Sequence, residues 1–263
     1  MKATTVFTWG YYGWGNATSW LVKAINAVEN SRGFKPPIFV DIRIRRTGRA
    51  EGFKASNFEK LLGPSRYRWM KTLGNRFIEN RTGLNIQIAD PAAANELLDL
   101  ALESAKHKRR ILFFCSCQWP RHNGETACHR STVAELVLKA AKNRGTAIEI
   151  VEWPGGKAKH LRMEVPRKIF AAIRRGRKTV PLGKQPDLAR FAGLPWCSTV
   201  TLKSKRETLH RVVGPAIRQR DQWVLPVLVQ FFDNSAILAT HQKEAERLRR
   251  SLGLNAISSS TTT

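Results

Sequence analysis

The chain has 263 residues, of which 42% are hydrophobic and 25% are charged, the composition of a globular protein rather than a disordered one. Lysine and arginine number 45 against 20 acidic residues, which gives a formal net charge of +25. A charge of that sign and size attracts polyanions, and nucleic acid is the first candidate partner. The alternative is a basic protein whose charge serves solubility or binds an acidic partner.

The sequence also excludes several classes of protein. No apolar run approaches the length of a membrane span, and the N-terminal residues lack the long apolar segment of a secretory signal. Four cysteines, two of them in a Cys-x-Cys pair, do not resemble an extracellular disulfide framework in a chain of this size. We therefore expect a soluble, cytoplasmic protein with no membrane partner, and its oligomeric state stays open.

Strands and helices alternate over residues 1–156, which we expect to form the first domain. Apolar, β-branched runs predict strands at residues 4–8, 37–44, 66–72, 110–115 and 147–152. Apolar residues at helical spacing predict helices at 19–28 with Ser19 as N-cap, at 57–62, from Asp90 and Pro91 onward, and at about 126–144. This alternation is typical of an α/β three-layer domain, in which helices cover both faces of a mostly parallel sheet.

The regular alternation stops at Trp153-Pro-Gly-Gly156, which predicts a linker. After it we expect a short basic helix, two apolar strands and a closing basic helix, at residues 165–175, 198–203, 224–232 and 242–252. These elements predict a smaller β-containing C-terminal domain over residues 157–257, followed by a disordered tail at 258–263.

The connection after the strand at 110–115 concentrates the residues with the most chemistry. Cys115 ends the strand, and Cys128, His129 and Arg130 open the next helix. Open α/β sheets bind ligands at the carboxyl ends of their strands, and the positive end of a helix dipole lowers the pKa of a thiol in the first turn. The pattern predicts a catalytic site with Cys128 as nucleophile, or else a cysteine that packs as a small apolar group.

Two other arrangements of these residues stay open. Cys115 and Arg121 have the Cys-x₅-Arg spacing of cysteine phosphatases, although no glycine lies between them and the helix starts several residues late. A zinc ion could be bound by Cys115, Cys117, Cys128 and His129. However, the one residue between the cysteines of Cys-x-Cys is fewer than zinc ligand pairs usually have, and no second pair is present. We assign no metal ligand and no cofactor, since a reduced thiol cluster or a reversible disulfide is the alternative.

Asp41 and Arg43 lie at the carboxyl end of the strand predicted over 37–44, where open sheets hold functional groups. In a site, Asp41 acts as a base or orients a ligand, and Arg43 binds an anion. An internal ion pair that orients the loops is the equal alternative.

Aromatic and basic residues indicate how nucleic acid would be bound. Four aromatic residues crowd into a glycine-rich loop after the first strand: Trp9, Tyr11, Tyr12 and Trp14. Exposed rings there would stack on bases, whereas buried rings would form an aromatic corner. We expect phosphate contacts from the arginines of the neighbouring loops, which are Arg43, Arg45, Arg46, Arg121 and Arg130. Trp196, Cys197 and the basic residues at 203–206 suggest a second contact surface, while Trp223 is expected in the core.

Several short motifs follow one another in order over about the first 155 residues. They are Thr-Trp-Gly10, Val40-Asp41-Ile42-Arg43, Gly52-Phe53, Tyr67 before Leu73-Gly74-Asn75, and Cys115 before Cys128-His129-Arg130-Ser131. Together they resemble the YeaO-like family, known as domain of unknown function 488. The resemblance implies a compact α/β domain with the marked residues gathered at one end of the sheet, and it implies no settled activity.

The chain departs from that pattern at one position. Members that resemble it place an acid two residues after the strand-end cysteine, where this chain has Cys117, and Glu125 is the nearest candidate substitute. A second segment, from Phe170 to Thr179, resembles ASCH and PUA-like modules. Those are small β-barrels associated with RNA or modified nucleotides.

These patterns together predict an enzyme that acts on nucleic acid or a nucleotide, in base modification or repair. Its site would join Asp41, Arg43, Cys115, Cys128, His129 and Arg130. One alternative is a non-catalytic nucleic-acid-binding module, in which the Cys-His-Arg turn holds a phosphate or stabilises the loop. Another is a cysteine-dependent phosphatase, and the choice between DNA and RNA stays open.

Overall fold

The computed structural model describes residues 3–11, 14, 17–48, 50–77, 86–117 and 128–227, together with the backbone of 121–122 and 125–126. Some sequence predictions lie outside these residues. They are the strand residues 228–232, the helix at 242–252, the tail at 258–263, Tyr12, and the side chains of Arg121 and Glu125.

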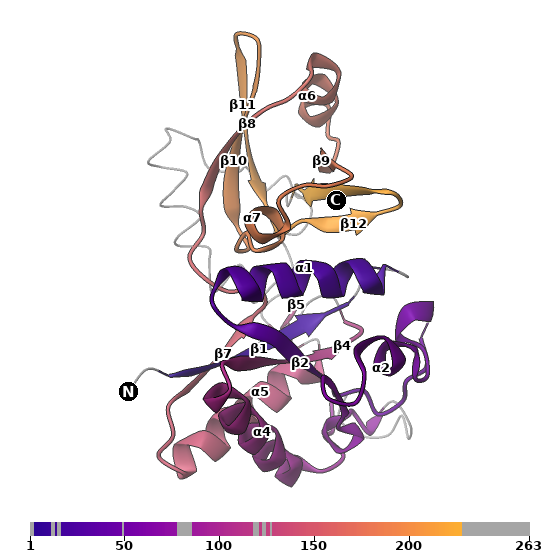
Figure 1. The fold of residues 1–263 in the computed structure, drawn as a ribbon, viewed down its shortest axis with the longest axis vertical. Helices are drawn as coiled ribbons and strands as arrows, with labels where there is room; N and C mark the ends of the chain where they lie inside the picture. The colour runs from indigo at the N-terminus through magenta and orange to yellow at the C-terminus, as the bar shows by residue number, and fades with distance from the viewer. Residues whose placement is uncertain are drawn as a thin grey trace.

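A five-stranded sheet forms the centre of the first half of the chain (Figure 1). Its strands are β1 (Thr4–Gly10), β2 (Lys35–Asp41), β3 (Tyr67–Trp69), β4 (Arg109–Cys115) and β7 (Ile148–Glu152). They lie in the order β3-β2-β4-β1-β7, and every neighbouring pair is parallel. The predicted α/β class with a mostly parallel sheet is therefore confirmed.

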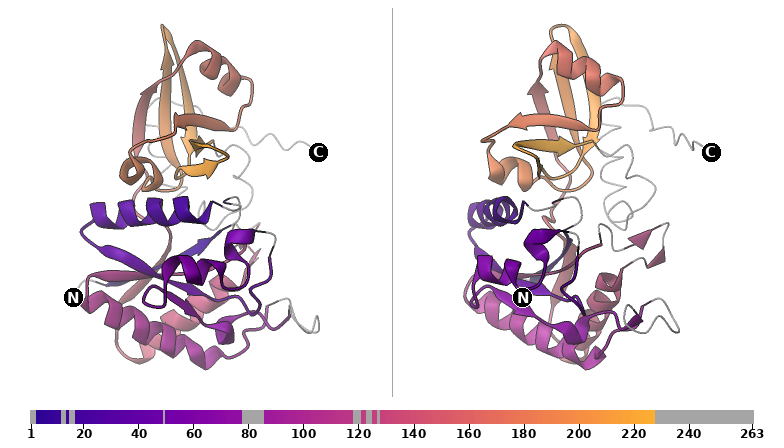
Figure 2. Two further views of the ribbon diagram at one scale, coloured as in Figure 1. Left: turned by 45° about the vertical axis from the view of Figure 1, so that its right-hand side comes forward. Right: turned by 90° about the vertical axis from the view of Figure 1, so that its right-hand side faces the viewer.

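Helices cover both faces of this sheet (Figures 1 and 2). They are α1 (Thr18–Ser31), α2 (Asn57–Leu62), α4 (Ala94–Lys106) and α5 (His129–Asn143), with single 3₁₀ turns at Glu51–Phe53, Lys71–Leu73 and Pro91–Ala93. Val6 and Phe113 pack toward α4 and α5, whereas Phe7 and Phe114 pack into the cluster that contains α1 and α2. Successive residues of a strand point to opposite faces, so runs such as Ile-Leu-Phe-Phe in β4 are apolar throughout.

The strand order reverses between β1 and β4. From β1 the chain passes through α1 to β2, on the far side of β4, whereas from β4 it passes through α5 to β7, on the far side of β1. The neighbouring carboxyl ends of β1 and β4 therefore form a topological switch point. Open α/β sheets leave a crevice for functional groups at such a point.

Residues 157–227, which we call the C-terminal unit, contain two three-stranded sheets (Figure 1). One is built from β8 (His160–Glu164), β10 (Ser198–Ser204) and β11 (Glu207–Val213), and the other from β9 (Thr179–Gly183), β12 (Ile217–Gln219) and β13 (Gln222–Pro226). Two helices accompany them, α6 (Arg167–Arg174) and α7 (Leu188–Ala192). Within the residues that the structure describes, no helix is long and apolar enough to cross a bilayer.

Helix α1 is buried from two sides, because it lies between the sheet and the C-terminal unit (Figures 1 and 2). Trp14, just before the helix, and Trp20, within it, meet Trp223 of β13 edge-on, with ring centroids 5.9 and 6.3 Å apart. One continuous cluster of buried apolar residues runs from the sheet through α1 into the C-terminal unit. The predicted core position of Trp223 is confirmed, since the residue is 1% exposed.

Some element boundaries differ from the predictions for local reasons. Helix α1 begins at Thr18 and its N-cap is Ala17, so Ser19 lies inside the helix. Residues 125–126 pair with 121–122 as the short strands β6 and β5, so α5 starts only at His129 and Cys128 becomes its N-cap. Strand β2 ends at Asp41, which places Arg43 in the following loop.

A buried ion pair joins that loop to the sheet. The Nε and Nη2 atoms of Arg43 donate to the Asp41 carboxylate at 2.8 and 2.5 Å, and the Tyr67 hydroxyl donates to it at 2.8 Å. Arg43 also donates to the Phe53 carbonyl at 2.9 Å and to the Tyr11 hydroxyl at 3.1 Å. Both charged groups thus have internal partners, which is the arrangement that makes a buried charge tolerable.

Replacing Asp41 by asparagine should therefore destabilise the fold strongly. Asp41→Asn leaves the buried Arg43 charge without its counter-ion, a change that costs about 3–5 kcal/mol. The midpoint of urea unfolding measures this loss. The matched control is Asp99→Asn, which removes one partner of an exposed ion pair with Arg144 and should cost no more than about 1 kcal/mol. Equal midpoints for both variants would contradict the assignment.

Candidate functional site

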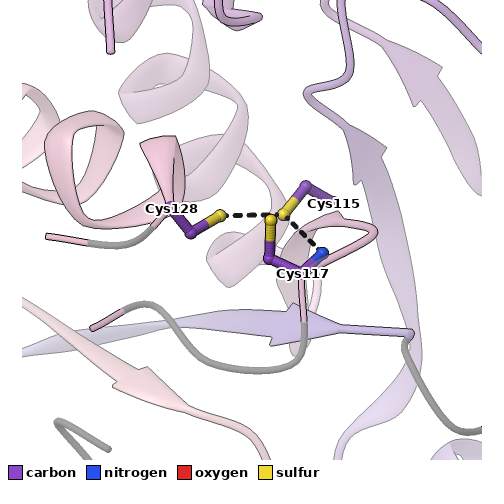
Figure 3. A group of neighbouring side chains, drawn as sticks. All are labelled: Cys115, Cys117 and Cys128. Carbon is purple, nitrogen blue, oxygen red and sulfur yellow. Dashed lines mark hydrogen bonds between the residues drawn. The ribbon is translucent and has the colours of Figure 1, made fainter. Parts of the chain in front are cut away.

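Three thiols come together at the carboxyl end of β4 (Figure 3). The Sγ atoms of Cys115, Cys117 and Cys128 all lie within 4.8 Å of one another, and Cys115 Sγ is 3.0 Å from Cys128 Sγ. Cys115 and Cys128 are 1% and 2% exposed, and Cys117 is partly exposed. All four cysteines of the chain are free thiols, and the fourth, Cys197, is buried in the C-terminal unit.

The local backbone explains how the thiols meet. Cys115 and Cys117 are two residues apart at a strand end, and the Cys117 N–H donates to Cys115 Sγ at 3.3 Å. A Cβ at Gly10, the last residue of β1, would overlap the Cys117 carbonyl oxygen, so the glycine permits this close approach. Across the switch point, the Tyr11 N–H donates to the Cys115 carbonyl at 3.2 Å. On the helix side, Cys128 Sγ accepts the Arg130 N–H at 3.5 Å, as an N-cap side chain does.

The Arg130 side chain is buried beneath the thiols. Its Nη1 donates to both carboxylate oxygens of Glu152, at 2.9 and 2.8 Å, and to Thr8 Oγ1 at 3.2 Å. Its Nη2 donates to the Cys117 carbonyl at 3.1 Å. The structure corrects the expectation that Arg130 contacts nucleic acid, because its guanidinium connects α5 to β1, β7 and the thiol turn inside the protein.

The three thiols have different acidities. Hydrogen bonds from Cys115 and Cys117 lower the pKa of Cys128 far below that of an ordinary thiol, with help from His129 and Arg130. Burial raises the pKa of Cys115. The hydrogen bond with Cys115 lowers the pKa of Cys117, but the hydrogen bond with Cys128 and burial outweigh it and raise that pKa to about 11. Cys128 therefore has the lowest pKa of the three thiols. Burial also raises the pKa of Glu152 to about 7, against the opposing effect of Arg130.

His129 lies between the thiols and the loop after β2. Its Nε2 is 3.0 Å from the Ile42 carbonyl oxygen, and its Nδ1 is 3.9 Å from Cys128 Sγ. A carbonyl oxygen only accepts hydrogen bonds, so the Nε2–H of His129 donates to the Ile42 carbonyl. Asp41 and Arg43 flank Ile42 in the chain, so this hydrogen bond connects His129 to the loop after β2.

Asp41 and Arg43 themselves form the internal ion pair that the sequence left as an alternative. All the partners of the Asp41 carboxylate described above are donors from Arg43 and Tyr67. The Tyr67 pKa is raised by burial and by the neighbouring Asp41 charge. The structure corrects the roles of base and anion-binding group expected for Asp41 and Arg43, because their polar atoms already serve one another.

The aromatic loop is an internal corner rather than a stacking platform. Trp9, Tyr11 and Trp14 are 4–5% exposed. Tyr11 stacks on Phe53 with centroids 4.0 Å apart. These rings therefore present no face to a base, and the prediction of a stacking surface is wrong for the three that the structure describes.

The remaining predicted contacts lie apart from the thiols. Arg45 is exposed. Arg46 donates to Glu59 at 2.7 Å and lies over the Trp69 ring at 4.1 Å from its centroid. Cys115, the nucleophile of the phosphatase alternative, is 1% exposed, and the side chain of Arg121 lies outside the described residues.

Sequence reasoning missed two residues of this region, Glu152 and Thr8. Glu152 ends the strand sequence Ile-Glu-Ile-Val-Glu, and in such an alternating run an acid is ordinarily assigned to the solvent face. The available signal was Arg130 in the buried stripe of α5, because a buried guanidinium requires an acidic partner.

Comparisons of the chain with family models, with curated proteins and with solved structures found no match. The resemblance to the YeaO-like family and the fainter one to ASCH and PUA-like modules therefore stay predictions.

The Arg130–Glu152 pair should dominate the stability of this region. Glu152→Gln keeps the side-chain shape but leaves the Arg130 charge buried without a counter-ion, at a cost of about 3–5 kcal/mol. Glu149→Gln is a matched control on the same strand, because Glu149 is exposed and its carboxylate accepts from Thr5 Oγ1. Urea unfolding should separate the two variants, and similar midpoints would show that the ion pair contributes little.

Adding a methyl group at Gly10 should disturb the thiol turn. Gly10→Ala forces the Cys117 carbonyl away from β1. Overpacking of this kind lowers the free energy of unfolding by about 1–3 kcal/mol, and we expect a loss of that size. Reaction with a thiol reagent should then be faster at Cys117 than in the wild type. Gly48→Ala serves as control, because its Cβ would meet only the Tyr11 hydroxyl at 3.2 Å. Unchanged stability and thiol reactivity in Gly10→Ala would contradict the close approach.

Proposed function

We propose that the protein binds nucleic acid, with the C-terminal unit as its main contact. Residues 157–227 contain 17 basic and 4 acidic residues. Eight exposed basic residues belong to α6, the segment just after it, the end of β10 and the turn from β10 to β11. They are Arg167, Lys168, Arg174, Arg175, Lys178, Lys203, Lys205 and Arg206, and we call them the α6 surface.

This surface is a continuous feature of the fold. The Val165 N–H, just before α6, donates to the Lys203 carbonyl at 2.9 Å. At the other end of the helix, Arg174 pairs with Glu207 of β11 at 2.8 Å. Figures 1 and 2 place α6 beside the β10–β11 hairpin at the end of the molecule away from the five-stranded sheet. Glu164 and Glu207 are the acidic residues within or beside it, so the excess of positive charge is large.

The clustering of these basic side chains is the single observation that carries the proposal. Lysine and arginine on a surface neutralise phosphates and release their counter-ions, which gives affinity without sequence preference. The buried aromatic corner supplies no stacking, which supports contact with the sugar-phosphate backbone rather than with the faces of bases.

A charge reversal on the hairpin turn tests the proposal. The triple variant Lys203→Glu, Lys205→Glu, Arg206→Glu should weaken binding to a 20-mer by about tenfold or more near 100 mM salt. The magnitude of the slope of log K against log salt should also decrease by about 2–3, because each lost phosphate contact reduces that magnitude by about one. Fluorescence anisotropy with single- and double-stranded DNA and RNA measures both quantities.

A second triple on the other unit provides the matched control. Lys106→Glu, Lys139→Glu, Lys142→Glu on α4 and α5 changes the net charge by the same amount and should leave the salt slope nearly unchanged. Equal losses in both triples would show that total charge, and not the α6 surface, governs binding. Negligible binding by the wild type near physiological salt would overturn the proposal.

A second candidate function is an enzyme that modifies bound nucleic acid or a nucleotide at the thiol site. The observation that favours it is the position of Cys128 beside the switch point, where open sheets place their reacting groups. Product analysis of each oligonucleotide after incubation with the wild type and with Cys128→Ser tests it. A chemical change in the oligonucleotide that Cys128→Ser fails to make supports an enzyme. Substrates that the wild type leaves unchanged favour a non-catalytic binding module.

A further inference from the structure

We propose that Cys115, Cys117 and Cys128 bind one zinc ion. This inference goes beyond nucleic-acid binding and does not depend on it, because the site lies in the sheet unit and the α6 surface in the C-terminal unit. The three sulfurs are the largest group of possible metal ligands that converge among the described residues, and thiolate is a soft ligand that binds Zn²⁺ well.

The sulfur spacing fits a single ion. Zinc–sulfur bonds of about 2.3 Å at tetrahedral angles place two sulfurs about 3.8 Å apart. The observed separations begin at 3.0 Å between Cys115 and Cys128 and extend to no more than 4.8 Å within the group, so they bracket that value. The shortest is still well beyond the roughly 2.05 Å of a disulfide bond. Small rotations of the side chains would equalise the three separations around one ion.

The backbone is arranged to hold sulfur in its charged form. Two of the three sulfurs accept a backbone N–H, Cys115 from Cys117 at 3.3 Å and Cys128 from Arg130 at 3.5 Å. Hydrogen bonds of this kind stabilise metal-bound thiolates and fix their orientation. Cys128 also stands at the N-terminus of α5, whose dipole favours negative charge there.

The charges around the site also suit a dication with three thiolates. Binding forms three Zn–S bonds and releases to solvent the protons that the thiols still carry, and Zn²⁺ with three thiolates has a net charge of −1. The Arg130 guanidinium, buried next to this group, donates to the Cys117 carbonyl and already has Glu152 as counter-ion. His129 Nδ1 lies beside Cys128 Sγ but outside the group of three, so the fourth tetrahedral position is left to a ligand from solvent.

The geometry also accounts for the short Cys-x-Cys spacing that argued against zinc in the sequence. A ligand pair on a free loop needs two or more intervening residues to turn both sulfurs toward one ion. Here Cys115 is still on the strand and Cys117 follows in the turn, so both side chains lie on the same side of the chain, and Cys128 arrives from the facing helix (Figure 3).

Metal content of the full-length, fully reduced chain tests the site. The wild type, purified with a phosphine reductant and then given zinc, should retain about one equivalent per chain after gel filtration, measured by elemental analysis. Cobalt substituted for zinc should show thiolate-to-cobalt charge transfer and the visible bands of a tetrahedral ion. A chromophoric chelator in competition gives the affinity of each variant.

Single cysteine variants separate the site from unspecific thiol binding. The affinity for zinc should fall by about 100-fold or more in each of three variants, Cys115→Ser, Cys117→Ser and Cys128→Ser, because each removes a direct ligand. Cys197→Ser is the matched control and should retain the wild-type stoichiometry, because burial raises the pKa of Cys197 to about 12 and it lies in the other unit. Cys117 is only partly buried, so Cys117→Ser decides the result if the two buried variants fail to fold.

Two outcomes would overturn the inference. One is a reduced, folded wild type, with native circular dichroism, that retains no zinc or cobalt. The other is a Cys117→Ser variant that binds zinc as tightly as the wild type. Neither outcome bears on the α6 surface, so failure here is distinguishable from failure of the nucleic-acid proposal.

Discussion

The buried guanidinium of Arg130 connects the parts of the structure that meet at the switch point. It bonds Glu152 on β7, Thr8 on β1 and the Cys117 carbonyl after β4, while its own backbone N–H contacts Cys128 Sγ. A charge inside a protein is tolerated only when its donors have partners, so these four segments must hold their positions together. At the switch point, where many open sheets bind a ligand, this protein has the buried Arg130 side chain, and the three thiols lie next to it.

The same principle explains how a protein with a strong positive charge folds. Among the described residues, three acidic side chains that are at most 8% exposed each have an arginine beside them: Asp41 with Arg43, Glu152 with Arg130, and Glu29 with Arg110. These acids stabilise the interior of the sheet unit and neutralise no charge on the surface. Most lysines and arginines of the C-terminal unit are exposed, with few acids near them, although Arg218 is buried. The buried acids of the sheet unit are thus each paired with an arginine, while the exposed surface carries most of the excess positive charge.

Local sequence patterns predicted the alternating elements of the sheet unit because apolar spacing is local information, as in the helix after Asp90. They did not predict the strand order, since the insertion of β4 between β1 and β2 depends on pairing between distant residues. The sequence placed the cysteines correctly in the connection between β4 and α5. It did not predict that Cys128 is the N-cap of α5, which follows because residues 125–126 pair with 121–122 in a short hairpin. The burial of Trp9 and the pairing of Glu152 could not be predicted, because composition does not say which side of a loop or strand meets the core.

The burial of α1 from two sides has a consequence for the order of folding during biosynthesis. Its outer side is covered by Trp223 and its neighbours, which follow Trp20 by about 200 residues. At typical translation rates of 5–20 residues per second, that interval lasts roughly 10–40 seconds. During this time the nascent sheet unit carries an uncovered apolar helix, which is a binding site for chaperones and a starting point for aggregation. Helix α1 therefore leaves the ribosome well before the residues that cover its outer side.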